Sequence, residues 1–176
     1  MRILIIGVNH QIQRQQICSW SSNGKLQAFE QDQKHRFGRM LQEKIREHHI
    51  DFVGEEARHE EESIAEKICK ESCRYCNIDM TPEQRALRKI HPGYNEDDTV
   101  SEAEKVRGNR EREDHMVSQL LAQAQKSEKI LVICGRLHSE AFACQLQAFG
   151  HTVEIEDLLN QNWYIEDRQN HMMHNL

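Results

Sequence analysis

Two histidines follow apolar segments of the chain at the same distance from a glycine. His10 lies three residues after Gly7, and His138 lies three residues after Gly135. Each glycine comes at the end of a run of aliphatic residues, which is typical of a strand buried on both faces. A glycine there lets the backbone turn sharply and approach a ligand. The repeated Gly-x-x-His pattern is therefore the first indication of a functional site.

Two carboxylates stand at the end of a third apolar segment. The segment 51–55 predicts a short strand, and Glu55 and Glu56 fall at its carboxyl end. Two neutral imidazoles and a carboxylate form a good ligand set for a divalent transition metal such as Mn, Zn, Co or Fe. Either glutamate suits that role. We assign Glu55 to the metal with His10 and His138, and Glu56 to the general base for a metal-activated water.

A charged helix supplies one further candidate. Residues 99–126 have a helical pattern, in which Arg112 shares a face with Met116. A guanidinium on that face would orient a substrate carboxylate or stabilise negative charge that develops on a substrate oxygen. The alternative is a solvated surface with ordinary i,i+4 pairs, such as Glu111 with His115.

Three cysteines allow a different hypothesis. Cys69, Cys73 and Cys76 have a spacing that resembles the radical-SAM iron–sulfur motif, with Tyr75 as the aromatic residue before the third cysteine. Three thiolates can hold a [4Fe–4S] cluster with one open iron. The radical-SAM motif follows the first strand of a larger barrel, whereas this one follows a helix in mid-chain. Buried thiols or a small zinc site are the other interpretations.

Composition limits the functional classes. The 176 residues suffice for one domain, predicted over 1–159, with a polar tail over 160–176. A net charge of −6 and an aromatic content of 6% argue against nucleic-acid binding, which needs positive charge and stacking surfaces. No apolar run approaches the ~18 residues of a membrane span, and the N-terminal run is too short for a signal peptide. We therefore expect a cytoplasmic protein whose cysteines are reduced.

The order of predicted elements gives the fold class. The predicted strands are 3–8, 51–55, 76–80, 129–134 and 151–159, and the predicted helices are 25–49, 60–73, 82–90, 99–126 and 139–149. Alternating strands and helices predict an α/β domain in three layers, with a mainly parallel central sheet and flanking helices. Ligands bind beyond the carboxyl ends of such strands. The two histidines and the two glutamates would all lie at that edge.

The motifs together resemble those of a known superfamily. The segments 7–10 and 135–138, with 51–56 between them, are similar to elements of the TraB/Tiki/erythromycin-esterase/ChaN-like superfamily. Glu111, Arg112 and Met116 resemble its Glu-Arg…Met helix. The resemblance implies a metal held by two histidines and a glutamate, with the arginine facing the cleft. Its members include metal-dependent proteases, esterase-like enzymes and haem-binding lipoproteins. The adjacent Glu55–Glu56 pair and the missing secretion signal depart from this pattern.

We therefore expect a metal-dependent hydrolase that acts on a small-molecule or peptide substrate. One alternative is a non-catalytic α/β module that binds an anionic small molecule or a protein partner. The other is a cysteine-ligated iron–sulfur or zinc protein. The sequence does not decide the oligomeric state.

Overall fold

A computed structural model describes residues 1–15, 24–90, 99–161, 163 and 164. Its strands form a single five-stranded sheet in the order β3-β2-β4-β1-β5. All neighbouring strands are parallel. The strands are β1 (Arg2–Val8), β2 (Phe52–Glu55), β3 (Arg74–Asn77), β4 (Lys129–Gly135) and β5 (Thr152–Asp157).

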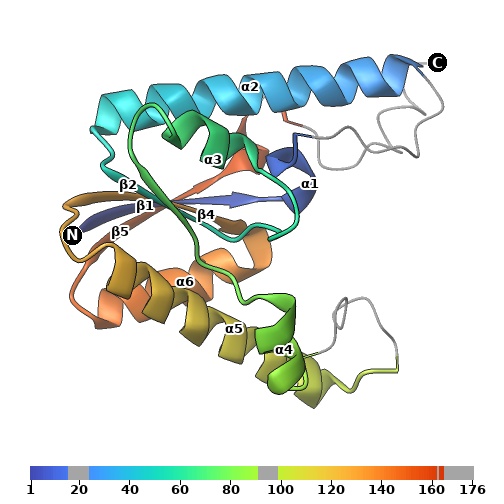
Figure 1. Ribbon diagram of the computed structural model, residues 1–176, viewed down its shortest axis with the longest axis vertical. Helices are drawn as coiled ribbons and strands as arrows, with labels where there is room; N and C mark the ends of the chain where they lie inside the picture. The colour runs from blue at the N-terminus through green and yellow to red at the C-terminus, as the bar shows by residue number, and fades with distance from the viewer. Residues whose placement is uncertain (16–23, 91–98, 162, 165–176) are drawn as a thin grey trace.

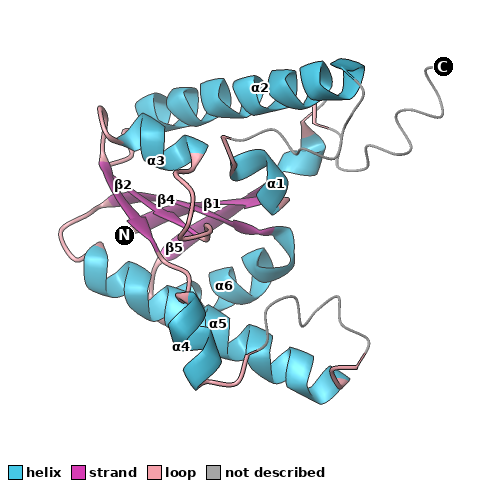
Figure 2. Ribbon diagram, turned by 45° about the vertical axis from the view of Figure 1, so that its right-hand side comes forward, coloured by secondary structure: helices cyan, strands magenta, loops and turns pink. Residues whose placement is uncertain are grey.

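Helices cover both faces of this sheet. They are α1 (His10–Gln13), α2 (Gly24–His48), α3 (Ile64–Cys69), α4 (Pro82–Leu87), α5 (Glu102–Gln123) and α6 (Arg136–Ala148), followed by a 3-10 turn, η1 (Leu158–Asn160). Figure 1 shows α2 and α3 on one side of the sheet and α5 and α6 on the other. Figure 2 shows the same separation from a second direction. The prediction of a three-layer α/β fold is confirmed.

The strand pleat divides the core into two parts. Along β1, Leu4 and Ile6 pack in the cluster that contains the apolar face of α2, whereas Ile3 and Ile5 pack in the cluster of α5 and α6. Successive side chains of a strand point to opposite faces. Because both faces of the central strands are covered, these strands are apolar throughout, as the sequence indicated.

Several predicted boundaries differ from those in the structure. The helix expected over 60–73 begins only at Ile64, because Ser63 caps it by accepting a hydrogen bond from the Glu66 N–H. The strand expected over 76–80 is β3, two residues earlier. The helix expected to start at 139 begins at Arg136, so His138 lies in the first turn of α6 instead of a loop.

Residue type explains two further helix ends. Thr81 and Gln84 form a capping box at the start of α4, with Pro82 in its first turn. Gly150 follows α6 with a φ of 81°. Near the end of the chain, Tyr164 is buried against the cluster on the α2 side, and most of the polar tail predicted over 160–176 lies outside the described residues. No helix in the described part of the chain could cross a bilayer.

Candidate active site

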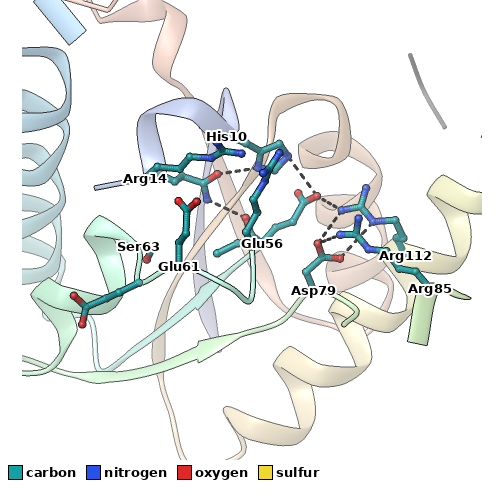
Figure 3. A pocket seen from close by; sticks show the side chains of 12 residues that line it. His10, Arg14, Glu56, Glu61, Ser63, Asp79, Arg85 and Arg112 are labelled. Atoms are coloured by element: carbon teal, nitrogen blue, oxygen red, sulfur yellow. Dashed lines mark hydrogen bonds and ion pairs between the residues drawn. The ribbon is translucent and has the colours of Figure 1, made fainter. Parts of the chain in front are cut away.

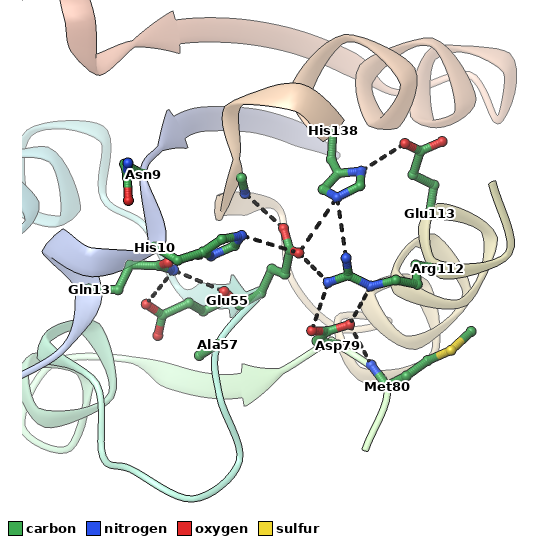
Figure 4. A network of polar contacts seen from close by, with 12 residues as sticks. Asn9, His10, Gln13, Glu55, Ala57, Asp79, Met80, Arg112, Glu113 and His138 are labelled. Atoms are coloured by element: carbon green, nitrogen blue, oxygen red, sulfur yellow. Dashed lines mark hydrogen bonds and ion pairs between the residues drawn. The ribbon is translucent and has the colours of Figure 1, made fainter. Parts of the chain in front are cut away.

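The sheet order brings three segments together. Strand β4 lies between β2 and β1, and parallel strands place their carboxyl ends at one edge of the sheet. Glu56 follows β2, His10 opens α1 directly after β1, and Gly135 ends β4. Figure 4 shows that the side chains of His10, Arg112 and His138 converge on one carboxylate at this edge. The structure thus brings together the two histidines that the sequence paired.

The carboxylate at the centre belongs to Glu56, whose side chain is 1% exposed. Its Oε2 accepts a hydrogen bond of 2.7 Å from the Gly135 N–H, and its Oε1 forms an ion pair with Arg112. The same Oε1 lies 3.5 Å from His10 Nε2 and 3.8 Å from His138 Nε2. Burial alone would raise the pKa of Glu56, but the positive charges of protonated His10, of Arg112 and of protonated His138 outweigh it and lower the pKa to about 2. Glu56 is therefore ionised at neutral pH.

Glu55 does not share this position. Because adjacent residues of a strand face opposite sides, it points toward the α2 side, where it is fully buried. Its carboxylate accepts hydrogen bonds from Gln13 Nε2 at 2.9 Å, Ser63 Oγ at 2.5 Å and Tyr75 Oη at 2.8 Å. Burial raises the pKa of Glu55, and these three hydrogen bonds limit the rise. The geometry gives no support to Glu55 as a ligand beside the histidines, because Glu56 stands there instead.

Glu55 nevertheless acts on His10 through Gln13. The Gln13 amide nitrogen donates to Glu55 and to the Glu56 carbonyl, so the Gln13 Oε1 atom must face His10. That oxygen lies 2.8 Å from His10 Nδ1, which therefore carries the hydrogen. In neutral His10, the Nε2 lone pair is left facing Glu56 and the pocket. The chain of contacts fixes both the ring orientation and its tautomer.

His138 is oriented in the same way from the other side of the sheet. Its Nδ1 lies 2.8 Å from Glu113 Oε1, so Nδ1 carries a hydrogen. Its Nε2 lies 3.5 Å from Arg112 Nη1, which can only donate. The geometry therefore fits neutral His138 with Nε2 as the acceptor. Both histidines consequently direct Nε2 at the Glu56 carboxylate.

Arg112 joins this carboxylate to a second one. Its Nη2 lies 3.0 Å from Asp79 Oδ2, in addition to its ion pair with Glu56. Asp79 also forms an ion pair with Arg85 and accepts a 2.7 Å hydrogen bond from the Met80 N–H. Arg112 is only 7% exposed, so the inward orientation predicted from its helix face is confirmed. All three of its guanidinium nitrogens have partners within the site, which leaves little for a substrate oxyanion.

The donor atoms do not fit a metal ion in this arrangement. A metal bound by His138 Nε2 and Glu56 Oε1 would need the lone pairs that face the Arg112 guanidinium. Within the described residues, no group of three or more His, Cys, Asp or Glu side chains is arranged to hold a metal. The guanidinium already supplies positive charge between the carboxylates.

The sheet separates the three cysteines of the iron–sulfur hypothesis. Cys69 and Cys73 pack against the cluster on the α2 side, whereas Cys76 packs against the cluster of α5 and α6. A hydrogen bond with Cys69 lowers the pKa of the Cys73 thiol to about 7. Because Cys76 lies across the sheet from the other two, this geometry gives no support to a shared cluster.

A pocket opens beside His10 and Glu56, with a volume of about 200 Å³. Figure 3 shows Arg14, Glu61 and Ser63 on one side of it and Asp79, Arg85 and Arg112 on the other. The half-exposed His10 ring, with 47% of its side-chain surface accessible, connects the buried carboxylate with this space. The buried His138 does not line it.

Sequence reasoning missed four of the residues that build the site. Gln13, Asp79, Arg85 and Glu113 carry no motif, and all four come from outside the strands. Glu113 had a usable signal, since it lies one residue after Arg112, within the helix that was singled out. Asp79 had none, because its position depends on where β3 ends.

These features define an α/β protein with a polar site of histidines, carboxylates and an arginine at the carboxyl edge of a parallel sheet. Comparisons with protein-family models, with curated proteins and with solved structures find no match.

Proposed function

We propose that this protein is a hydrolase in which His10 removes a proton from a water molecule that attacks the substrate. The observation that carries the proposal is the environment of His10. Its Nδ1 is held by Gln13 at 2.8 Å, while Nε2 faces the pocket and lies 3.5 Å from an ionised, buried carboxylate. An imidazole held in one orientation, with an unprotonated nitrogen facing a pocket, can act as a general base.

Each neighbouring group has a role in this proposal. Glu56 stabilises the imidazolium that forms when His10 accepts the proton, and Arg112 together with the Gly135 N–H keeps Glu56 ionised and in place. Arg85 lines the pocket, is fixed by Asp79, and has an Nε–H without a partner among the described residues. Its guanidinium is therefore suited to stabilise negative charge on the substrate carbonyl oxygen. The proposal thus gives the stabilisation of negative charge on the substrate to Arg85, whereas the sequence suggested Arg112 for it.

The metal-dependent version of this hydrolase, which the sequence predicts, remains an alternative proposal. Two imidazoles and a carboxylate suit a divalent transition metal by their chemistry. This version requires that Arg112 leave Glu56 Oε1 when the metal binds. The two versions differ in whether the activity depends on an added metal.

The test uses hydrolysis of p-nitrophenyl acetate by the purified chain. Wild type is compared with His10→Gln and with His48→Gln, a control that removes an exposed histidine at the end of α2. We expect His10→Gln to lower the rate about 10²-fold or more, the size of general-base catalysis, and His48→Gln to leave it unchanged. Equal rates in all three proteins would refute the proposal.

Treatment with EDTA separates the two versions. Unchanged activity supports direct water activation by His10. Loss of activity that Mn²⁺, Zn²⁺ or Co²⁺ restores supports the metal-dependent version and contradicts the direct one.

A further inference from the structure

Besides the Nε–H of Arg85, the pocket wall contains a donor and an acceptor of opposite charge, on two adjacent segments, that the protein leaves unsatisfied. Arg14 directly follows α1, and Glu61 belongs to the loop between β2 and α3. A backbone bridge between Arg14 and Ser63 holds these two segments side by side. Arg14 Nε and Glu61 Oε2 are buried, yet neither has a hydrogen-bond partner among the described residues. Native proteins contain few such atoms, and a ligand or ordered water is a common reason for them.

Four other charged residues of the pocket have ion-pair partners within the protein. Asp79 pairs with both Arg85 and Arg112, and Glu62 pairs with Lys70. Arg14 and Glu61 therefore stand out as the pair that a ligand would complete. A simple anion would satisfy Arg14 and be repelled by Glu61, and a simple cation would do the reverse. A ligand with both charges close together satisfies both residues.

We propose that Arg14 and Glu61 bind the α-carboxylate and the α-ammonium group of a small free amino acid. Its side chain then extends toward His10 and Glu56, which line the same pocket. The inference deepens the proposed function, on which it rests for the position of the bond to be hydrolysed. The substrate class is an amino acid with a hydrolysable amide or ester in its side chain.

The size of the pocket agrees with such a ligand. About 200 Å³ is below the roughly 300–1,000 Å³ of sites for drug-sized molecules. A single amino acid fits this volume, whereas an extended peptide would reach beyond the pocket.

Isothermal titration calorimetry with three probes tests the inference on the full chain. The probes are L-glutamine, N-acetyl-L-glutamine, which lacks the ammonium group, and L-glutamine α-amide, which lacks the carboxylate. We expect wild type to bind L-glutamine roughly tenfold or more tightly than either blocked form, because a buried charged partner is lost. Glu61→Gln should abolish the preference over the acetylated form. Arg14→Gln should abolish the preference over the α-amide.

Glu62→Gln is the matched control, because Glu62 lines the same pocket but already has Lys70 as its partner. It should keep both preferences. Equal binding of the three probes, or no binding of any, would overturn the inference. Hydrolysis of p-nitrophenyl acetate is measured in parallel. Binding without His10-dependent hydrolysis supports the amino-acid site and refutes the proposed function, whereas the opposite result refutes only the site.

Discussion

His10, which follows the first strand, lies against Gly135, which ends the fourth. A Cβ atom on Gly135 would be only 2.8 Å from His10 Nε2 and 3.3 Å from Glu56 Oε2. The glycine of the second Gly-x-x-His segment thus makes room for the histidine of the first, and its N–H holds the carboxylate that lies between the two histidines. The two segments form one site through this contact.

Gly135→Ala should displace the His10 ring and lower hydrolysis about 10²-fold, because small displacements of a catalytic group have effects of that size. The half-exposed ring can move outward, so the free energy of unfolding should change by less than about 1 kcal/mol. Rates and urea unfolding curves measure the two effects. Gly38→Ala is the control and should not affect the rate. A Cβ atom at this position of α2 would be 3.5 Å from its nearest neighbour, a methyl group of Ile64, which is an ordinary contact. A fully active Gly135→Ala protein would contradict this role of the glycine.

Gln13→Met should release the tautomer of His10. The Gln13 Oε1 atom lies 2.8 Å from His10 Nδ1 and accepts its hydrogen, whereas a thioether in its place is only a weak acceptor. We expect the hydrogen of neutral His10 to shift toward Nε2, where the Glu56 carboxylate accepts it. The shift is visible in the ¹⁵N shifts of the imidazole, and the rate of hydrolysis should fall at least tenfold.

Gln11→Met provides the control for that experiment, because it makes the same change at an exposed position of α1. It should leave the Nδ1 hydrogen and the rate as in wild type. The same imidazole shifts in Gln13→Met and wild type would show that Gln13 does not fix the tautomer.

The stability of the protein should depend on the ionisation of Glu56. Its pKa in the folded protein, about 2, lies below the ordinary value of 4.5. The stabilisation is therefore fully present above about pH 4.5 and is lost as the pH falls toward 2, by on the order of 3 kcal/mol. Glu55 acts in the opposite direction, because its raised pKa favours folding as it takes up a proton. Urea unfolding of wild type and Glu56→Gln across this range measures the difference.

Glu56→Gln should flatten this part of the pH profile. Glu43→Gln, at an exposed position of α2, should leave the profile of wild type unchanged. Parallel profiles for wild type and Glu56→Gln between pH 5 and pH 2 would contradict the lowered pKa.

Arg112→Met should destabilise the protein by about 3–5 kcal/mol, because it leaves the buried carboxylates of Glu56 and Asp79 without their shared cation. Thermal or urea unfolding measures the loss. Arg107→Met removes a more exposed arginine of the same helix, paired with Glu111, and should cost no more than about 1 kcal/mol. Adding Glu56→Gln to Arg112→Met should recover part of the stability. No recovery would mean that lost packing, not unpaired charge, explains the effect.

The sequence predicted the layers and the paired histidines because both follow from short-range patterns. Uninterrupted apolar runs identified β1 and β4, and the two glycines located His10 and His138 at equivalent strand ends. The pleat also requires that Glu55 and Glu56 face opposite sides. Which side each one faces depends on which core the strand shares with its neighbours, and that information is not local.

The partners of those residues were harder to predict. Gln13 and Asp79 act through a particular side-chain direction at the end of a short element, where a shift of one residue would turn them away. The prediction that Arg112 stabilises an oxyanion overlooked Asp79, which helps to occupy the guanidinium.

The strand order also has a consequence for folding during synthesis. Strand β2 can pair with β3 soon after both leave the ribosome, but β1 has only β4 and β5 as neighbours. Its first partner begins at Lys129, so more than a hundred residues must be made before β1 can enter the sheet. Synthesis proceeds at about 5–20 residues per second, so this apolar segment remains unpaired for several seconds or longer. The nascent chain should therefore be a substrate for chaperones that hold exposed apolar segments until β4 emerges.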